Sequence, residues 1–198
     1  MKKILVICLA LLLAGCGNEI TTVKKGNGNS KTYLFFEKFD VNNYYVSFWD
    51  RNTSINDDSK IIFVRNGDKY YYEFDGYERN IIIQKEGKRY SINPLRREYH
   101  VEDKALEDFA LGILPNDINK LKKQGYKTGE EKIYGKKYIF EKFSNEIGDT
   151  TYYFKGKKLI YVKYEGVQKN VFLKFNYMKK DFSLKIFEIR SDFEEISY

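Results

Sequence analysis

The chain contains very little cysteine and histidine, and this scarcity excludes several kinds of chemistry. Cys8 and Cys16 both lie within the first sixteen positions, and His100 is the single histidine. The residues after Cys16 therefore form no disulfide and supply no thiol nucleophile. A zinc site usually needs several histidine or cysteine ligands, so we expect neither a metal nor a cofactor.

The sequence also lacks the motifs of nucleophilic catalysis and phosphate binding. A Ser-His-Asp arrangement would have to use His100, and there is no Gly-x-Ser-x-Gly segment. The phosphate-binding pattern Gly-x-x-x-x-Gly-Lys-Ser/Thr is absent, and Gly26-Asn27-Gly28 lies in the predicted tether. We therefore expect no catalytic residue, and we interpret His100 as an ordinary strand or loop residue.

Carboxylates remain as the one catalytic option. Adjacent residues on a strand face opposite sides, so neighbouring acids do not form an acid–base pair by themselves. Such pairs are Glu102–Asp103, Glu130–Glu131 and Glu194–Glu195. A sugar hydrolase that brings distant acids together is a weaker alternative. Asp192, Glu194 and Glu195 are expected to form a solvated C-terminal end.

The first sixteen residues have the layout of a secretory signal. Lys2 and Lys3 precede an apolar run over residues 4–13, and small residues then lead to Cys16. The run is too short to cross a bilayer as a stable helix, although an uncleaved anchor is the alternative. The ending Leu-Ala-Gly-Cys resembles a bacterial lipobox, which implies a signal peptide at residues 1–15, lipid attachment at Cys16 and an extracytoplasmic, membrane-anchored protein.

The charge balance is mildly basic. The formal net charge is +7, and removal of residues 1–15, with two lysines and no acid, lowers it to +5. Nucleic acid is not expected as a partner of an exported, tethered chain. Anionic lipid headgroups or anionic wall polymers suit a weakly basic surface better.

Composition along the chain predicts a tether followed by one domain. Residues 16–31 are polar, rich in glycine and asparagine and without periodicity, so we interpret them as a flexible tether. Residues 32–198 are long enough for a single domain with a core. Eighteen tyrosines, fifteen phenylalanines and one tryptophan can supply the apolar area of that core.

Most of the domain is expected to be β-strand. Asn66-Gly67 and Glu86-Gly87 are strong hairpin signals between apolar runs. Residues 33–39 fit either a short helix or a first strand. The runs that indicate strands are 44–51, 60–65, 69–74, 79–85, 88–93, 96–101, 131–134, 137–143, 150–154, 158–164, 170–177 and 182–189.

Helix signals occur only in the middle of the chain. Asp103 can cap a helix whose apolar stripe is formed by Leu106, Phe109, Ala110, Ile113 and Leu114, and which Pro115 ends. A second helix is predicted over residues 117–124, with Ile118 and Leu121 facing inward. About ten antiparallel strands and two or three short helices predict an α+β fold. We expect a curved antiparallel sheet, an incomplete β-barrel, with the helices packed on its concave face.

Several local motifs resemble the LolA/LolB-like lipoprotein fold, an incomplete β-barrel closed by helices. They are Leu114-Pro115 ahead of a short helix, the Gly-x-Glu-x-Ile-x-Gly pattern within residues 129–138, and the strand 151–154 that leads through a glycine turn into residues 159–161. Size, lipobox and composition are similar to the GerS family of clostridial spore-germination lipoproteins.

That resemblance implies a non-catalytic, membrane-anchored binding protein of the spore envelope. Its partner would be a zinc-dependent N-acetylmuramoyl-L-alanine amidase of the CwlD type, which it would activate. This amidase begins the formation of muramic-δ-lactam in the spore cortex, which germination requires. No short motif identifies partner-binding residues, so none is carried over.

The aromatic residues admit further interpretations. One face formed by Tyr70, Tyr72, Phe74, Tyr138 and Phe140 is expected to be either a packed core or a groove for acyl chains, the latter making the protein a lipid or lipoprotein carrier. Tyr71 and Tyr153 are expected to form either an exposed patch for a protein partner or scattered surface positions. Exposed strand edges leave a strand-swapped homodimer open.

Overall fold

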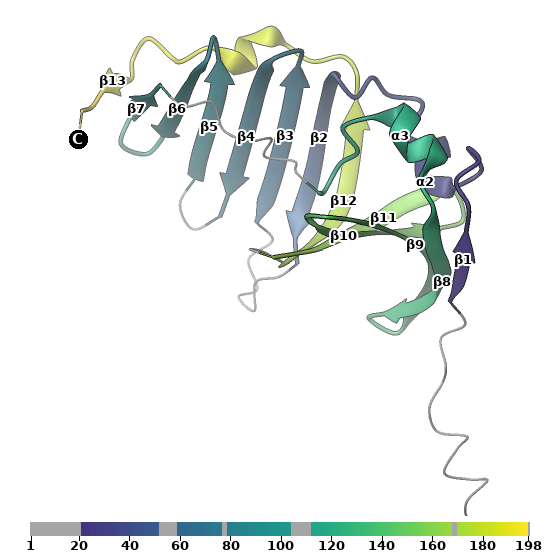
Figure 1. Cartoon of the computed structure of the whole chain (residues 1–198). Helices are drawn as coiled ribbons and strands as arrows, with labels where there is room; N and C mark the ends of the chain where they lie inside the picture. The colour runs from purple at the N-terminus through teal and green to yellow at the C-terminus, as the bar shows by residue number, and fades with distance from the viewer. Residues whose placement is uncertain (1–20, 52–58, 77–78, 104–111, 168–169, 198) are drawn as a thin grey trace, which may run out of the picture.

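The computed structural model describes residues 21–51, 59–76, 79–103, 112–167 and 170–197 (Figure 1). These residues form one large, curved, unclosed sheet of thirteen strands with few and short helices. All neighbouring strands are antiparallel except β13 and β7, which run parallel. The prediction of a curved antiparallel sheet with few helices is therefore confirmed.

The strands are β1 (Thr22–Lys24), β2 (Asn43–Asp50), β3 (Lys60–Asn66), β4 (Lys69–Asp75), β5 (Arg79–Lys85), β6 (Lys88–Asn93), β7 (Glu98–Glu102), β8 (Tyr126–Ile133), β9 (Lys136–Asn145), β10 (Gly148–Lys155), β11 (Lys158–Gly166), β12 (Asn170–Lys179) and β13 (Glu194–Glu195). The helical elements are α2 (Lys31–Phe36), α3 (Ile118–Lys123) and the 3₁₀ turn η1 (Leu184–Phe187).

Two meanders build the sheet and meet at its centre. Strands β2 to β7 pair in chain order, and so do β8 to β12. The meanders join where β12 pairs with β2, from Leu173 opposite Asp50 to Lys179 opposite Tyr45. The short strands β1 and β13 lie at the two far edges, and they do not meet (Figure 1).

Tight two-residue turns connect the predicted hairpins. Gly67 has φ of 62° and lies between paired Asn66 and Lys69, while Glu86 and Gly87 have φ of 55° and 74°. Positive φ at such positions matches the right-handed twist of the flanking strands. Both hairpin predictions are confirmed, the first with its turn at Gly67–Asp68.

The largest core lies on the face of the sheet that carries α2 and α3, here called the helix face. Phe36 of α2 and Leu121 of α3 are buried there against strands of both meanders. The Phe36 ring packs edge-on against Tyr152 with centroids 5.6 Å apart, and Phe35 packs against Phe175 at 5.4 Å. Such aromatic pairs contribute beyond the area that they bury.

Residues 180–197, the C-terminal segment, cross the opposite face of β3 to β7. Phe187 is buried there with Ile83 and Ile92, and Ile186, Ile189 and Phe193 pack around them. The strand predicted over residues 182–189 is therefore wrong. Ser183 Oγ accepts a hydrogen bond from the Lys185 amide and caps the 3₁₀ turn η1, and Leu184 in this turn is 58% exposed. The segment packs on a sheet face and not at a sheet edge, so it does not pair as a strand.

A buried carboxylate fixes the N-terminal part of the domain. Glu141 of β9 accepts hydrogen bonds from the backbone amides of Lys31 and Thr32, each at 2.8 Å, and from Thr32 Oγ1 at 2.8 Å. Ser30 Oγ accepts from the Tyr33 amide as the N-cap of α2. Negative charge is favourable at a helix N-terminus, so these contacts decide that the residues after Ser30 form a helix.

The tether predicted for residues 16–31 must be corrected in its second half. Thr22 and Lys24 pair with Thr128 and Tyr126 of β8, and the Gly28 amide donates to the Lys122 carbonyl at 3.1 Å. Backbone hydrogen bonds to the sheet and to α3 thus hold residues 22–28 on the domain.

Two sequence predictions lie outside the described residues. The signal peptide with Cys16 belongs to residues 1–20, and Leu106, Phe109 and Ala110 of the predicted middle helix belong to residues 104–111. The later members of that stripe, Ile113 and Leu114, are buried in the core of the helix face. In the part of the chain that is described, no helix has the length and apolar character needed to cross a membrane.

We expect Glu141→Gln to destabilise the domain by about 2 kcal/mol, because hydrogen bonds to a charged acceptor are lost in a buried place. Urea unfolding followed by circular dichroism measures this change. The matched control is Glu130→Gln on β8, whose exposed carboxylate faces Lys137 at 3.4 Å and should contribute less than about 0.5 kcal/mol. Equal stability of the two variants would contradict the anchoring role of Glu141.

Candidate functional site

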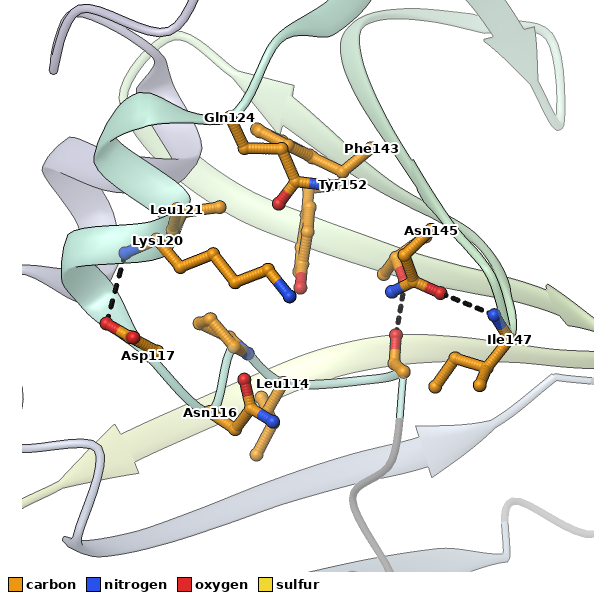
Figure 2. Close-up of a pocket in the computed structure, with 13 residues that line it drawn as sticks. Leu114, Asn116, Asp117, Lys120, Leu121, Gln124, Phe143, Asn145, Ile147 and Tyr152 are labelled. Atoms are coloured by element: carbon orange, nitrogen blue, oxygen red, sulfur yellow. Dashed lines mark hydrogen bonds between the residues drawn. The ribbon is translucent and has the colours of Figure 1, made fainter.

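A pocket lies on the helix face, beside α3 and the ends of β9 and β10 (Figure 2). Its volume is about 90 Å³. The residues around it are Gly112, Leu114, Pro115, Asn116, Asp117, Lys120, Leu121, Gln124, Phe143, Asn145, Ile147, Thr150 and Tyr152. Figure 2 shows Lys120 extending across this space toward Tyr152.

The short helix α3 forms one wall because its ends are well defined. Asp117 Oδ1 is the N-cap of α3 and accepts from the amides of Asn119 at 2.8 Å and Lys120 at 3.0 Å. Leu121 is buried against the sheet, and Gln124 Nε2 donates to the Ser144 carbonyl at 3.1 Å. The helix predicted over residues 117–124 is thereby confirmed.

Two side chains of β10 hold the segment that leads into α3. Thr150 Oγ1 donates to the Gly112 carbonyl, and Tyr152 Oη donates to the Ile113 carbonyl at 3.2 Å. Burial raises the pKa of Tyr152 above its usual value. The phenol therefore stays protonated and remains a hydrogen-bond donor at neutral pH.

The chemistry available in this pocket is limited. The Asp117 carboxylate caps α3, and Asn145 Oδ1 accepts from the amides of Ile147 and Gly148 at 2.9 and 3.1 Å. These polar groups therefore serve the local backbone. A volume of about 90 Å³ is also well below that of most small-molecule pockets, about 300–1,000 Å³. A space of this volume holds a few water molecules.

A second cavity of about 200 Å³ lies on the opposite face, under the C-terminal segment. Most of its wall is aliphatic or aromatic, formed by Ile81, Ile83, Ile92, Ile186, Ile189 and Phe193. At its edge the buried carboxylate of Glu73 lies 2.7 Å from Arg79 Nε and accepts from Tyr71 Oη at 2.6 Å. Burial and this hydrogen bond to Glu73 raise the pKa of Tyr71.

The aromatic face predicted from Tyr70, Tyr72, Phe74, Tyr138 and Phe140 is divided between two sides of the sheet. Tyr72 and Phe74 pack against the core of the helix face. Tyr138 and Phe140 belong to a cluster on the opposite face with Tyr153 and Tyr161. The reason is alternation along β9, where Glu141 and Phe143 point to the helices and Tyr138 and Phe140 therefore point away.

The exposed aromatic patch predicted from Tyr71 and Tyr153 is wrong, because these rings are 6% and 2% exposed. Each buried phenol has a carboxylate partner: Tyr71 donates to Glu73 at 2.6 Å and Tyr153 donates to Glu131 at 2.8 Å. A buried tyrosine needs such an acceptor for its hydroxyl.

The candidate acids are dispersed. Glu130 forms an exposed ion pair with Lys137 at 3.4 Å, and Glu102 faces Arg89 at 3.4 Å. His100 lies in β7, with Nδ1 3.1 Å from the Ile196 carbonyl. Over the described ranges, the side chains of His, Cys, Asp and Glu form no group of three or more that could hold a metal ion.

Sequence reasoning missed the two residues that organise the helix face. Glu141 is a lone acid between Phe140 and Phe143, and a charged residue inside an apolar strand run signals a buried partner. Tyr152 carries no comparable signal, because it stands in the aromatic run Tyr152-Tyr153-Phe154. Only the register of β10 shows which face of the sheet Tyr152 occupies and which face Tyr153 occupies.

We expect Tyr152→Phe to lower the free energy of unfolding by about 1–2 kcal/mol, because the Ile113 carbonyl loses its donor in a buried place. Amide hydrogen exchange of Ile113 and Leu114 should accelerate in the same variant. Tyr134→Phe, at a ring that is 70% exposed, is the control and should leave stability unchanged. Unaltered exchange in Tyr152→Phe would refute the proposed role of this hydroxyl.

Comparison with protein-family models and with curated protein sequences finds no match to this chain.

Proposed function

We propose that the protein is a membrane-anchored, non-catalytic binding lipoprotein that docks onto a cell-wall N-acetylmuramoyl-L-alanine amidase and supports its activity. In this proposal Cys16 carries the lipid, and the curved sheet is a LolA/LolB-like half-barrel. The biological setting is the modification of spore cortex to muramic-δ-lactam that germination requires. The family resemblance of the sequence motivates the partner and the setting.

The observation that supports a protein partner is the filling of the helix face. Phe36, Phe48 and Phe154 are among the largest fully buried side chains, and the rings of Tyr126 and Phe143 stack with centroids 5.4 Å apart. The pocket beside α3 and the cavity under the C-terminal segment hold about 90 and 200 Å³. Because its own side chains fill the interior, the domain has its outer surface available for recognition. An outer surface of this kind, over a filled interior, suits a macromolecular partner.

The same packing gives less support to the alternative, a lipid or lipoprotein carrier. A carrier needs an apolar groove that an acyl chain can enter. Here Phe36 and Leu121 from the two helices occupy the apolar side of the sheet. Lipid carriage on this face would require the helices to separate from the sheet, against the Glu141 contacts that hold α2.

The amidase proposal is tested with purified components. The chain from residue 17 to 198 is mixed with a zinc amidase of the CwlD type and analysed by size-exclusion chromatography with light scattering. We expect co-elution at a defined ratio and faster release of stem peptides from peptidoglycan, with the amidase alone as control. Separate elution of two folded proteins would count against the proposal, and so would normal muramic-δ-lactam in spores that lack the gene.

We further propose that two copies can associate through exchanged strands, because one edge of the sheet is incompletely covered. In β8, β1 pairs with Tyr126, Lys127 and Thr128, and within the described part of the chain no strand pairs with the outer side of residues 129–133. An edge with unpaired backbone groups is a template for another chain.

Light scattering on the same preparation tests this association. We expect a molar mass twice that of one chain at micromolar concentration, with exchange slow enough that mixed, differently tagged samples form heterodimers only after partial unfolding. A monomer mass over the whole concentration range would exclude the homodimer and leave the amidase proposal intact.

A further inference from the structure

Two neighbouring hairpins form a basic end of the domain. The β8–β9 turn and its flanks carry Lys132, Lys136 and Lys137, and the β10–β11 turn carries Lys155, Lys157 and Lys158. All six side chains are exposed. Within residues 130–138 and 154–159 there are six lysines against two glutamates, a net charge of +4, compared with +7 for the whole chain.

The strand register brings these two turns together. Ile139 of β9 pairs with Phe154 of β10, so Lys155 lies one residue further along, beside Tyr138 and next to Lys137. The β8–β9 and β10–β11 turns therefore lie at the same end of their strands. Glu130 forms an ion pair with Lys137 at 3.4 Å and Glu131 accepts from Tyr153 at 2.8 Å, and the net charge of +4 already includes both carboxylates.

The chain enters the domain from the same direction. Strand β1 is antiparallel to β8, and Thr22, its first residue, is the one nearest the β8–β9 turn. In Figure 1 the start of β1 and the β8–β9 hairpin lie on the lower side, whereas α3 and η1 lie on the upper side. A segment that precedes β1 therefore leaves the domain at the basic end.

The length of the chain between Cys16 and β1 limits the distance between the domain and the membrane. Thr22 lies six positions after Cys16, and a fully extended chain over six positions spans about 20 Å. Tyr134 at the tip of the hairpin also lies six positions after Thr128, the partner of Thr22, which is about 20 Å of strand. A lipid at Cys16 thus reaches no further than the hairpin itself extends.

We propose that the basic end formed by the β8–β9 and β10–β11 turns is a membrane-contact surface that binds anionic lipid headgroups and orients the domain. This inference rests on the lipid anchor at Cys16 in the proposed function. A lipid chain and a basic patch are two membrane signals that reinforce each other. Tyr134, 70% exposed at the tip, has the amphipathic side chain that favours the headgroup region.

The test uses lipidated protein in vesicles of phosphatidylglycerol or of phosphatidylcholine. Once the signal is removed and Cys16 is acylated, an introduced cysteine is the single reactive thiol. A fluorophore is placed at Tyr134→Cys or, as the matched control on the upper side, at Leu184→Cys, whose side chain is 58% exposed. We expect a headgroup-attached quencher to quench position 134 and not position 184, in anionic vesicles and at low salt.

Charge reversal tests the electrostatic part. The triple variant Lys136→Glu, Lys155→Glu and Lys157→Glu should lose the quenching at position 134. The control triple variant Lys123→Glu, Lys180→Glu and Lys185→Glu changes the same charge at exposed positions elsewhere and should retain it. In 1 M salt the wild-type quenching should also be lost, because screening shortens the range of the interaction to about 3 Å.

The outcomes separate this inference from the proposals on which it depends. Equal quenching at positions 134 and 184, or quenching that survives reversal of the three lysines, overturns the membrane-contact surface alone. Failure of the protein to float with neutral vesicles overturns the lipid anchor and this inference together. Binding of soluble polyglycerol phosphate by the same lysines, without orientation on vesicles, assigns the surface to a wall polymer and also overturns the inference. The vesicles contain no amidase, so amidase docking is judged separately.

Discussion

Pairing of β12 with β2 is the constraint on which the rest of the structure depends. It joins the meander β2–β7 to the meander β8–β12, although the two strands are more than a hundred residues apart in the chain. Leu173 of β12 and Val46 and Phe48 of β2 are completely buried at this junction. Without it each meander would expose an apolar face, and the helices would have only half of the surface on which they pack.

Glu141 is the second long-range contact with consequences beyond its own neighbourhood. Its carboxylate binds the start of α2, and α2 places Phe35 against Phe175 of β12 and Phe36 against Tyr152 of β10. The same contact, with the pairing of β1 to β8, draws the N-terminal chain along one edge of the sheet. In the proposed lipoprotein, Cys16 stands six positions before Thr22 of β1, so the anchor that we propose would hold the domain close to the membrane.

In our interpretation, different surfaces of the molecule have different roles. The helix face is occupied by the protein's own side chains, and the pocket beside α3 is small. In the proposed function, recognition belongs to outer surfaces and strand edges, and we propose that the basic hairpin end faces the lipid while the remaining surface is available to an amidase. In the pocket beside α3, the side chains of Asp117 and Asn145 accept hydrogen bonds from the local backbone.

Local patterns in the sequence determined the hairpins and the capped helix, because turn residues such as Glu86-Gly87 and the N-cap Asp117 act over a few positions. The lipobox at Cys16 is likewise a local pattern, and it stays a prediction from sequence. Only the tertiary structure decided between helix and strand after Ser30, since the deciding acceptor, Glu141, is 109 residues from Thr32. It also decided that β1 belongs to the sheet, that residues 182–189 are no strand, and that Tyr138 and Tyr72 face opposite sides. Each of these depends on contacts between distant parts of the chain, and a local pattern carries no information about which distant segment will be its neighbour.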